Sequence, residues 1–142
     1  MAELTHFDNN GNAHMVDISE KQISFRIAKA ACSVHMSLET LKIISDGSAK
    51  KGDVLSVARI AGIQGAKRTS ELIPLCHPIS LTKVNLDLIL NEKLPGIEII
   101  ATAKTTGPTG VEMEALTAAG VSALTVYDMV KSLDKSLIIK NL

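Results

Sequence analysis

The architecture of this chain depends first on residues Val54-Leu55-Ser56-Val57-Ala58-Arg59-Ile60-Ala61-Gly62-Ile63-Gln64-Gly65-Ala66-Lys67-Arg68. The segment has helical spacing, and Asp53 before it can accept hydrogen bonds from the free amides of a first turn. One face of the expected helix carries only small residues, at positions i, i+3, i+4, i+7 and i+8: Ala58, Ala61, Gly62, Gly65 and Ala66. We therefore expect another backbone to approach closely along that face.

A second helix with the same pattern is expected from about Gly110 to Ser132. Its small residues repeat the spacing of the first stripe: Ala115, Ala118, Ala119, Ser122 and Ala123. The two stripes predict one close helix pair. Ser37 can cap a shorter helix over residues 38–44, which Asp46-Gly47 would end.

Alternation of apolar and polar residues predicts strands at about 22–36, 82–90, 97–103 and 136–139. In the first strand the apolar parity changes near Lys29–Ala31, which predicts a bulge. The second and third form a hairpin across Asn91–Gly96. The order of elements indicates an α+β fold, with an antiparallel sheet covered on one face by helices. We expect residues 21–142 to form a single catalytic domain and residues 1–20 a flexible arm.

Charge and composition exclude several classes of protein. Lys plus Arg equals Asp plus Glu at 15 each, so no net charge draws the chain to nucleic acid or to a membrane surface. Two Phe, one Tyr and no Trp offer few rings for stacking on bases. No stretch has the character of a leader or a membrane span, so we expect a cytoplasmic protein. Cys32 and Cys76 lack CxxC spacing and are expected to be free thiols.

Reactive side chains gather where the first long helix ends. Pro74 and Pro78 fix backbone angles on either side of Leu75-Cys76-His77, which predicts a rigid extended segment. His77 can move protons near neutral pH, although a histidine in such a segment is more often held by structural hydrogen bonds. Metal binding by Cys76, His77 and a carboxylate is an alternative, but adjacent ligands lack the spacing of a structural zinc motif.

Acidic residues mark both ends of the second long helix. Gly107-Pro108-Thr109-Gly110 leads into its first free amides, and is either a simple turn or an anion site. Glu112 and Glu114 point to different sides, so at most one should belong to a given pocket, and Glu114 has the better claim. Asp128 shares the face of Glu114, but fourteen residues of helix separate them by about 21 Å. Either the ligand is elongated or two protomers share one site, and we prefer the second reading.

Basic residues flank both ends of the first long helix: Lys50, Lys51, Lys67 and Arg68. Each is most simply a solvated charge, as is Arg26 in the first strand, and Asp128 with Lys131 could be a surface ion pair. If such cations converge, they suit phosphates. Taken together, these groups indicate acid–base chemistry on a small phosphorylated substrate.

A set of motifs runs in order along the chain: His6–Asp8, Met15–Asp17, Lys51–Val54, Ala66–Thr69, Leu72–Pro78, Gly107 with Thr109–Thr117, and Tyr127–Met129 with Lys131. The ordered set resembles the cyclic pyranopterin monophosphate synthase family of molybdenum cofactor biosynthesis. The resemblance implies a ferredoxin-like α+β fold and a homohexamer, built as a trimer of dimers with active sites at the dimer interface. It implies a phosphorus–oxygen lyase that converts 3',8-cyclo-7,8-dihydroguanosine triphosphate into cyclic pyranopterin monophosphate with release of pyrophosphate. No resident cofactor or metal site is implied, although Mg²⁺ is an option for the triphosphate.

The resemblance also implies roles for individual residues. Substrate contacts fall on one group: Leu75, Cys76, His77, Met113, Glu114 and, next to them, Glu112. The catalytic aspartate falls on Asp128, and other functional positions on Lys51, Lys131, Arg26 and Lys67. We assign acid–base work to the two lysines Lys51 and Lys131, which Asp128 would hold and tune. Arg26 and His77 are assigned to phosphate contact.

Two other classes of function stay open at this stage. One is a non-catalytic module that binds a nucleotide or a pterin. The other is a metal-dependent hydrolase that uses Cys76 and His77.

Overall fold

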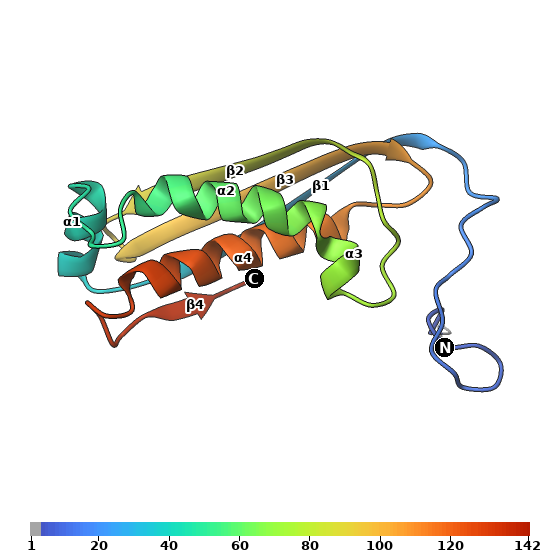
Figure 1. Cartoon of the computed structure of the whole chain (residues 1–142), viewed down its shortest axis with the longest axis horizontal. Coiled ribbons are helices and arrows are strands. Elements are labelled where there is room, and N and C mark those ends of the chain that lie inside the picture. Colours follow the sequence, from blue (N-terminus) through green and yellow to red (C-terminus); the bar gives the residue numbers. More distant parts are fainter. Residues whose placement is uncertain (1–3) are drawn as a thin grey trace.

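The computed structural model describes residues 4–142 (Figure 1). Its elements are β1 (Ser24–His35), α1 (Leu38–Ser45), α2 (Val54–Lys67), α3 (Thr69–Leu72), β2 (Leu81–Asn91), β3 (Gly96–Gly107), α4 (Glu112–Val130) and β4 (Ile138–Lys140). The expected strands and the three expected helices are confirmed. The one-turn helix α3 was not expected, because four residues are too few to show a helical period.

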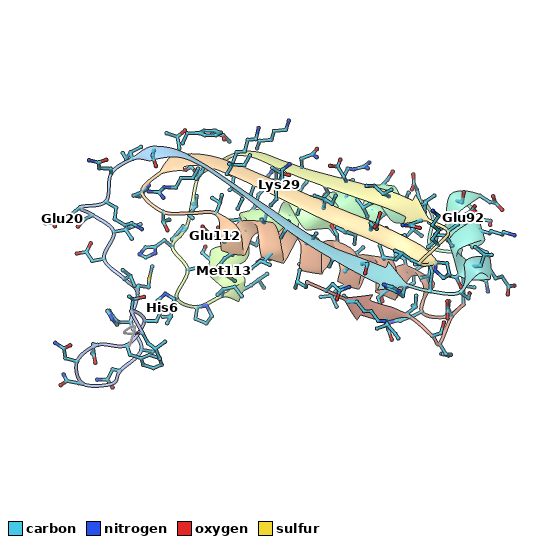
Figure 2. The ribbon with its side chains drawn as sticks, turned by 180° about the vertical axis from the view of Figure 1, so that it is seen from behind. His6, Glu20, Lys29, Glu92, Glu112 and Met113 are labelled. Atoms are coloured by element: carbon cyan, nitrogen blue, oxygen red, sulfur yellow. The ribbon has the colours of Figure 1, made fainter. Side chains whose placement is uncertain are left out.

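The four strands form one antiparallel sheet in the order β2-β3-β1-β4. Helices α2 and α4 lie across one face of it, as Figure 1 shows, and the inward residues of β3 (Ile97, Ile99, Ala101 and Ala103) are fully buried beneath them. Among residues 4–142 no helix crosses the other face, which is turned to the viewer in Figure 2. The predicted α+β, ferredoxin-like fold with helices on one face is confirmed.

The bulge predicted in β1 is absent. Ser24–His35 pairs with β3 without a shift in register, and the one irregularity of the described sheet lies in β2, between Leu81 and Lys83. The apolar parity changes because Phe25 and Ile27 lie on the open face, where they are 65% and 51% exposed, whereas Cys32 and Val34 are buried on the face that the helices cover.

The predicted close helix pair is confirmed. Ser122 Oγ of α4 donates a hydrogen bond of 2.8 Å to the carbonyl oxygen of Ala58 in α2. A Cβ atom at Gly62 would lie 2.9 Å from the carbonyl oxygen of Ala118. The two helices run in opposite directions (Figure 1), so the start of α2 lies beside the end of α4. Each end of the pair therefore brings together side chains from both helices.

Other expectations concern the termini, the cysteines and membranes. Cys32 and Cys76 are both free thiols, as predicted. None of the helices in the described part of the chain has the length and apolarity needed to cross a bilayer. The flexibility of the arm stays a prediction, and its residues 1–3 lie outside the described part.

Candidate active site

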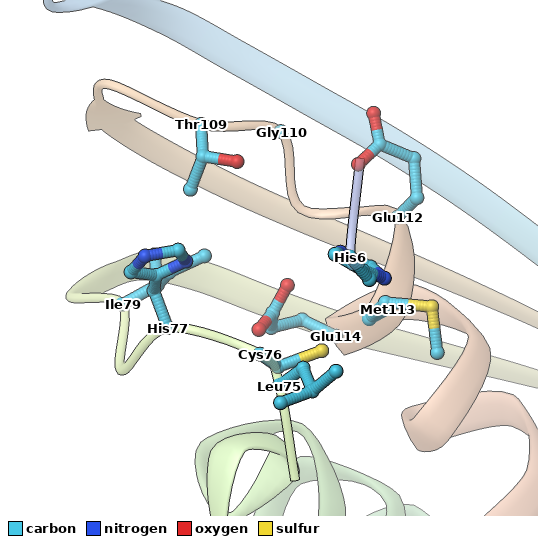
Figure 3. A pocket seen from close by; sticks show the side chains of 10 residues that line it. All are labelled: His6, Leu75, Cys76, His77, Ile79, Thr109, Gly110, Glu112, Met113 and Glu114. Carbon is cyan, nitrogen blue, oxygen red and sulfur yellow. The ribbon is translucent and has the colours of Figure 1, made fainter. Parts of the chain in front are cut away.

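A cavity of about 150 Å³ lies where α4 begins (Figure 3). It is lined by all six residues of segments 75–77 and 112–114 that were predicted to contact substrate: Leu75, Cys76, His77, Glu112, Met113 and Glu114. Two segments that are more than thirty residues apart in sequence therefore meet on one cavity. Their roles toward a ligand stay predictions.

The proline-framed segment forms one wall. The segment was predicted to be extended, and this is wrong for its first part. A turn closes there, where the amide of Cys76 donates to the carbonyl oxygen of Ile73 at 3.1 Å. The chain then runs without regular structure through His77 to β2. Cys76 and His77 are half-buried and line the cavity. The turn that follows α3 thus aims both side chains at the start of α4.

Glu112 and Glu114 supply the acidic part of the cavity, and the expectation that at most one would join it is wrong. Glu112 is the first residue of α4, and its carboxylate turns back over Gly110 rather than following the helical direction. Glu114 is only 3% exposed. Burial raises the pKa of the Glu114 carboxyl, and the carboxylate of Glu112 raises it further.

The thiol of Cys76 responds to the same surroundings. Burial raises the pKa of Cys76, and the charge of Glu114 adds to the effect. Cys76 is therefore a protonated thiol at neutral pH rather than a nucleophile. Within residues 4–142 no group of three His, Cys, Asp or Glu side chains is placed to hold a metal ion.

Three predicted catalytic residues form a second cluster at the far end of the helix pair. Lys51 Nζ lies 3.1 Å from Asp128 Oδ2 and donates to the carbonyl oxygen of Asp128 at 3.1 Å. Lys131 Nζ lies 2.9 Å from Asp128 Oδ1. Hydrogen bonds from Lys131 and Lys51 hold the pKa of the Asp128 carboxyl below its usual range. The bond to Asp128 also raises the pKa of Lys131.

The two clusters do not meet within one chain. Glu114 and Asp128 lie fourteen residues apart in the continuous helix α4, a separation of about 21 Å at about 1.5 Å per residue. Lys67 ends α2 on the cavity side, whereas Lys51 precedes α2 on the other, so the flanking cations do not converge. Arg26 Nε donates to the carbonyl oxygen of Gly107 at 2.9 Å, beside the turn that leads to the cavity.

Four further residues line the cavity: His6, Ile79, Thr109 and Gly110. Thr109 and Gly110 belong to the turn that the sequence marked as an anion-site candidate, and no side chain caps the helix that follows it. His6 belongs to the expected arm and to one of the motifs that carry the family resemblance, but the sequence assigns it no role in a site. No periodicity could have placed it, because it reaches the cavity through tertiary contact.

Comparison with known proteins adds an independent observation. The MoaC family model matches residues 15–142. Proteins named cyclic pyranopterin monophosphate synthase are similar over 96% of this chain: one from Dinoroseobacter shibae at 61% identity, and one each from Jannaschia sp. and Cereibacter sphaeroides (strain ATCC 17029 / ATH 2.4.9) at 59%. The match covers 87%, 84% and 86% of those three proteins. Because the family model spans nearly the whole chain and the relatives share more than half of its residues, the chain belongs to the MoaC family.

Proposed function

We propose that this protein is a lyase of molybdenum cofactor biosynthesis. It converts 3',8-cyclo-7,8-dihydroguanosine triphosphate into cyclic pyranopterin monophosphate and releases pyrophosphate. The observation that carries the proposal is the near full-length identity to proteins named cyclic pyranopterin monophosphate synthase. The cavity lends support, because it gathers every predicted contact residue from residues 75–77 and 112–114.

The reaction needs proton transfers during ring rearrangement and charge stabilisation during phosphoryl transfer. A sugar hydroxyl attacks the α-phosphorus, the new phosphorus–oxygen bond closes the cyclic phosphate, and the bond to pyrophosphate breaks. Lys131, with its pKa raised by Asp128, is protonated at neutral pH and suits a proton donor or a counter-charge for the leaving group. A lysine acting as a base would need a lowered pKa, which requires further burial or another cation nearby.

We place the complete site between two protomers. About 21 Å separates the acidic cavity from the lysine cluster within one chain, so a compact site draws the two ends from different copies. Exposed apolar side chains support self-association: Phe25 and Ile27 on the open sheet face, and Leu116 and Leu124 on α4. The proposed assembly is a cytoplasmic homohexamer, a trimer of dimers. It carries no resident cofactor, and Mg²⁺ would enter only with the triphosphate.

Alanine substitutions of the lysine cluster test the proposed chemistry. Lys51→Ala, Asp128→Ala and Lys131→Ala should each lower product formation by at least about 100-fold, because each removes an acid–base or counter-charge group. Lys135→Ala is the matched control, since Lys135 is exposed and takes part in none of the described ion pairs. Near-normal turnover in one of the three variants removes that residue from the mechanism. Tight binding of the substrate by the wild type without any turnover favours a binding module instead.

Mixing two inactive variants tests the shared site. Asp128→Ala and Glu114→Gln subunits, dissociated and reassociated at equal amounts, should regain about a quarter of the wild-type rate. The reason is that half of the dimers then hold one of each subunit, and one of their two sites is intact. Absence of any recovery in verified mixed oligomers contradicts a site built from two copies.

A further inference from the structure

The N-terminal arm contributes a side chain to the cavity. His6 lines it together with the residues of the proline-framed segment and the start of α4. Figure 3 shows its ring on the same side of the cavity as Glu112 and Met113, with His77 on the other side. An imidazole from the arm therefore faces the exposed carboxylate of the cavity.

Local hydrogen bonds give the arm a defined shape at this point. The Asp8 carboxylate accepts hydrogen bonds from the amides of Asn10 and Asn12, both at 2.9 Å. The amide of His14 donates to the carbonyl oxygen of His6 at 2.9 Å, which closes a small hairpin. His6 is thus held at the base of a turn rather than on a free tail.

A second contact fixes the arm beside the cavity. Ile18 is half-buried, unlike most of the arm, and lines a separate cavity of about 210 Å³ with Pro78, Ile79 and Thr105–Thr109. That cavity lies between the wall that carries His77 and the turn that leads into α4. Ile18 therefore anchors the arm next to both walls of the candidate site.

We propose that His6 is a substrate-contacting residue, carried to the site by an arm that Ile18 anchors. The inference rests on the proposed function, because the substrate it invokes is the anionic cyclised dihydro-GTP. Glu112 and Glu114 place carboxylates around the cavity, and these repel a triphosphate. The His6 imidazole beside Glu112 donates a hydrogen bond to the ligand and offsets the Glu112 charge when protonated.

The inference predicts a coupling between His6 and Glu112. His6→Gln should raise KM and the Kd for the cyclised dihydro-GTP by about tenfold to a hundredfold, the range for one hydrogen bond to a charged partner. In a Glu112→Gln background the same change should cost clearly less than in the wild type, because the contribution from offsetting the Glu112 charge is gone and only the hydrogen bond to the ligand is lost. Ile18→Ala should reproduce the His6→Gln loss, and the two changes together should add little.

His14→Gln is the matched control, since His14 lies in the same hairpin and does not line the cavity. Turnover and calorimetric Kd are measured for each variant, and circular dichroism must give the wild-type unfolding midpoint for His6→Gln. Equal values for the His6→Gln and His14→Gln variants overturn the inference. So does an undiminished His6→Gln loss in the Glu112→Gln background, because His6 then does not act against the Glu112 charge. If the wild type turns the substrate over and the His6→Gln variant has the same KM and Kd, only the inference is refuted. If the wild type neither binds the substrate nor turns it over, the proposed function is refuted as well.

Discussion

Replacing Gly62 with alanine should push helices α2 and α4 apart. The new Cβ would lie 2.9 Å from the carbonyl oxygen of Ala118, a backbone atom that cannot turn away, and would displace the Ser122 hydroxyl. The hydroxyl would then lose its 2.8 Å hydrogen bond to the carbonyl oxygen of Ala58. The helix pair must therefore separate or rotate.

The magnitude follows from three opposing contributions. Overpacking of a close contact costs about 1–3 kcal/mol, and loss of the buried hydrogen bond about 0.5–1.5 kcal/mol. Alanine gains about 0.5–1 kcal/mol over glycine in helix propensity. The net loss in unfolding free energy is about 1–3 kcal/mol, and the unfolding temperature should fall by about 3–12 °C. Activity should fall too, because α2 positions Lys51 against Asp128 at 3.1 Å.

Urea unfolding followed by circular dichroism, at one fixed protein concentration, measures the effect in a chain that has no tryptophan. Gly120→Ala serves as the matched control within α4. Its Cβ would meet only Leu142, at 3.7 Å, so the variant should gain about 0.5–1 kcal/mol from helix propensity. If Gly62→Ala is as stable as Gly120→Ala, the steric argument for the close helix pair is refuted.

Three further outcomes follow, two from titratable groups and one from the absence of a metal-binding cluster among residues 4–142. Burial opposes ionisation of Asp134, but bonds from Ser136, Ser37 and Thr40 outweigh it and keep its pKa below the usual range. Asp134→Asn should therefore lower the free energy of unfolding by about 1–3 kcal/mol above pH 5. The difference in unfolding free energy between wild type and variant, measured with urea, should narrow as the pH falls below about 4, and a difference that does not change with pH contradicts this. Glu114→Gln removes a charge that raises the pKa of Cys76, so iodoacetamide should alkylate Cys76 faster at pH 8, with buried Cys32 as the internal standard. Slower or unchanged labelling excludes that coupling. EDTA treatment should leave the circular dichroism spectrum and unfolding midpoint unchanged, and a loss of structure would reveal a metal site.

The sequence predicted the helix pair because period and residue size were both visible in it. Small residues at helical spacing fix a face, and Gly62 and Ser122 do meet there. It could not distinguish a bulge in β1 from an apolar outer face, because both change the parity of Phe25 and Ile27 relative to Cys32. In the second case Phe25 and Ile27 stay exposed on the open face, and the alternation of residues alone does not reveal this.

The candidate site, like the fold, was predictable where local patterns carry the information and not where tertiary packing decides. Short-range patterns marked the ionisable residues of both clusters, and the family resemblance added Leu75 and Met113. Helical geometry misjudged Glu112, whose side chain folds back over Gly110 at the start of α4. Helix directions apply within a helix and fail at its first residue, where the side chain leans over the preceding turn. His6 was part of a family motif, but its place at the cavity was not predicted, since only tertiary packing brings the arm there.

The helix pair that organises the fold also keeps the two clusters apart. The close contact along α2 and α4 makes a rigid unit, with the acidic cavity at one end and Lys51 with Asp128 at the other. Bending that unit would break the small-residue packing, so no conformational change within one subunit brings the ends together at modest cost. Under the proposed shared site, the cavity and the lysine cluster of one subunit belong to two different active sites. In a mixed dimer, two inactivating mutations on the same subunit should therefore damage both sites. The same two mutations on different subunits should damage one site and leave the other intact.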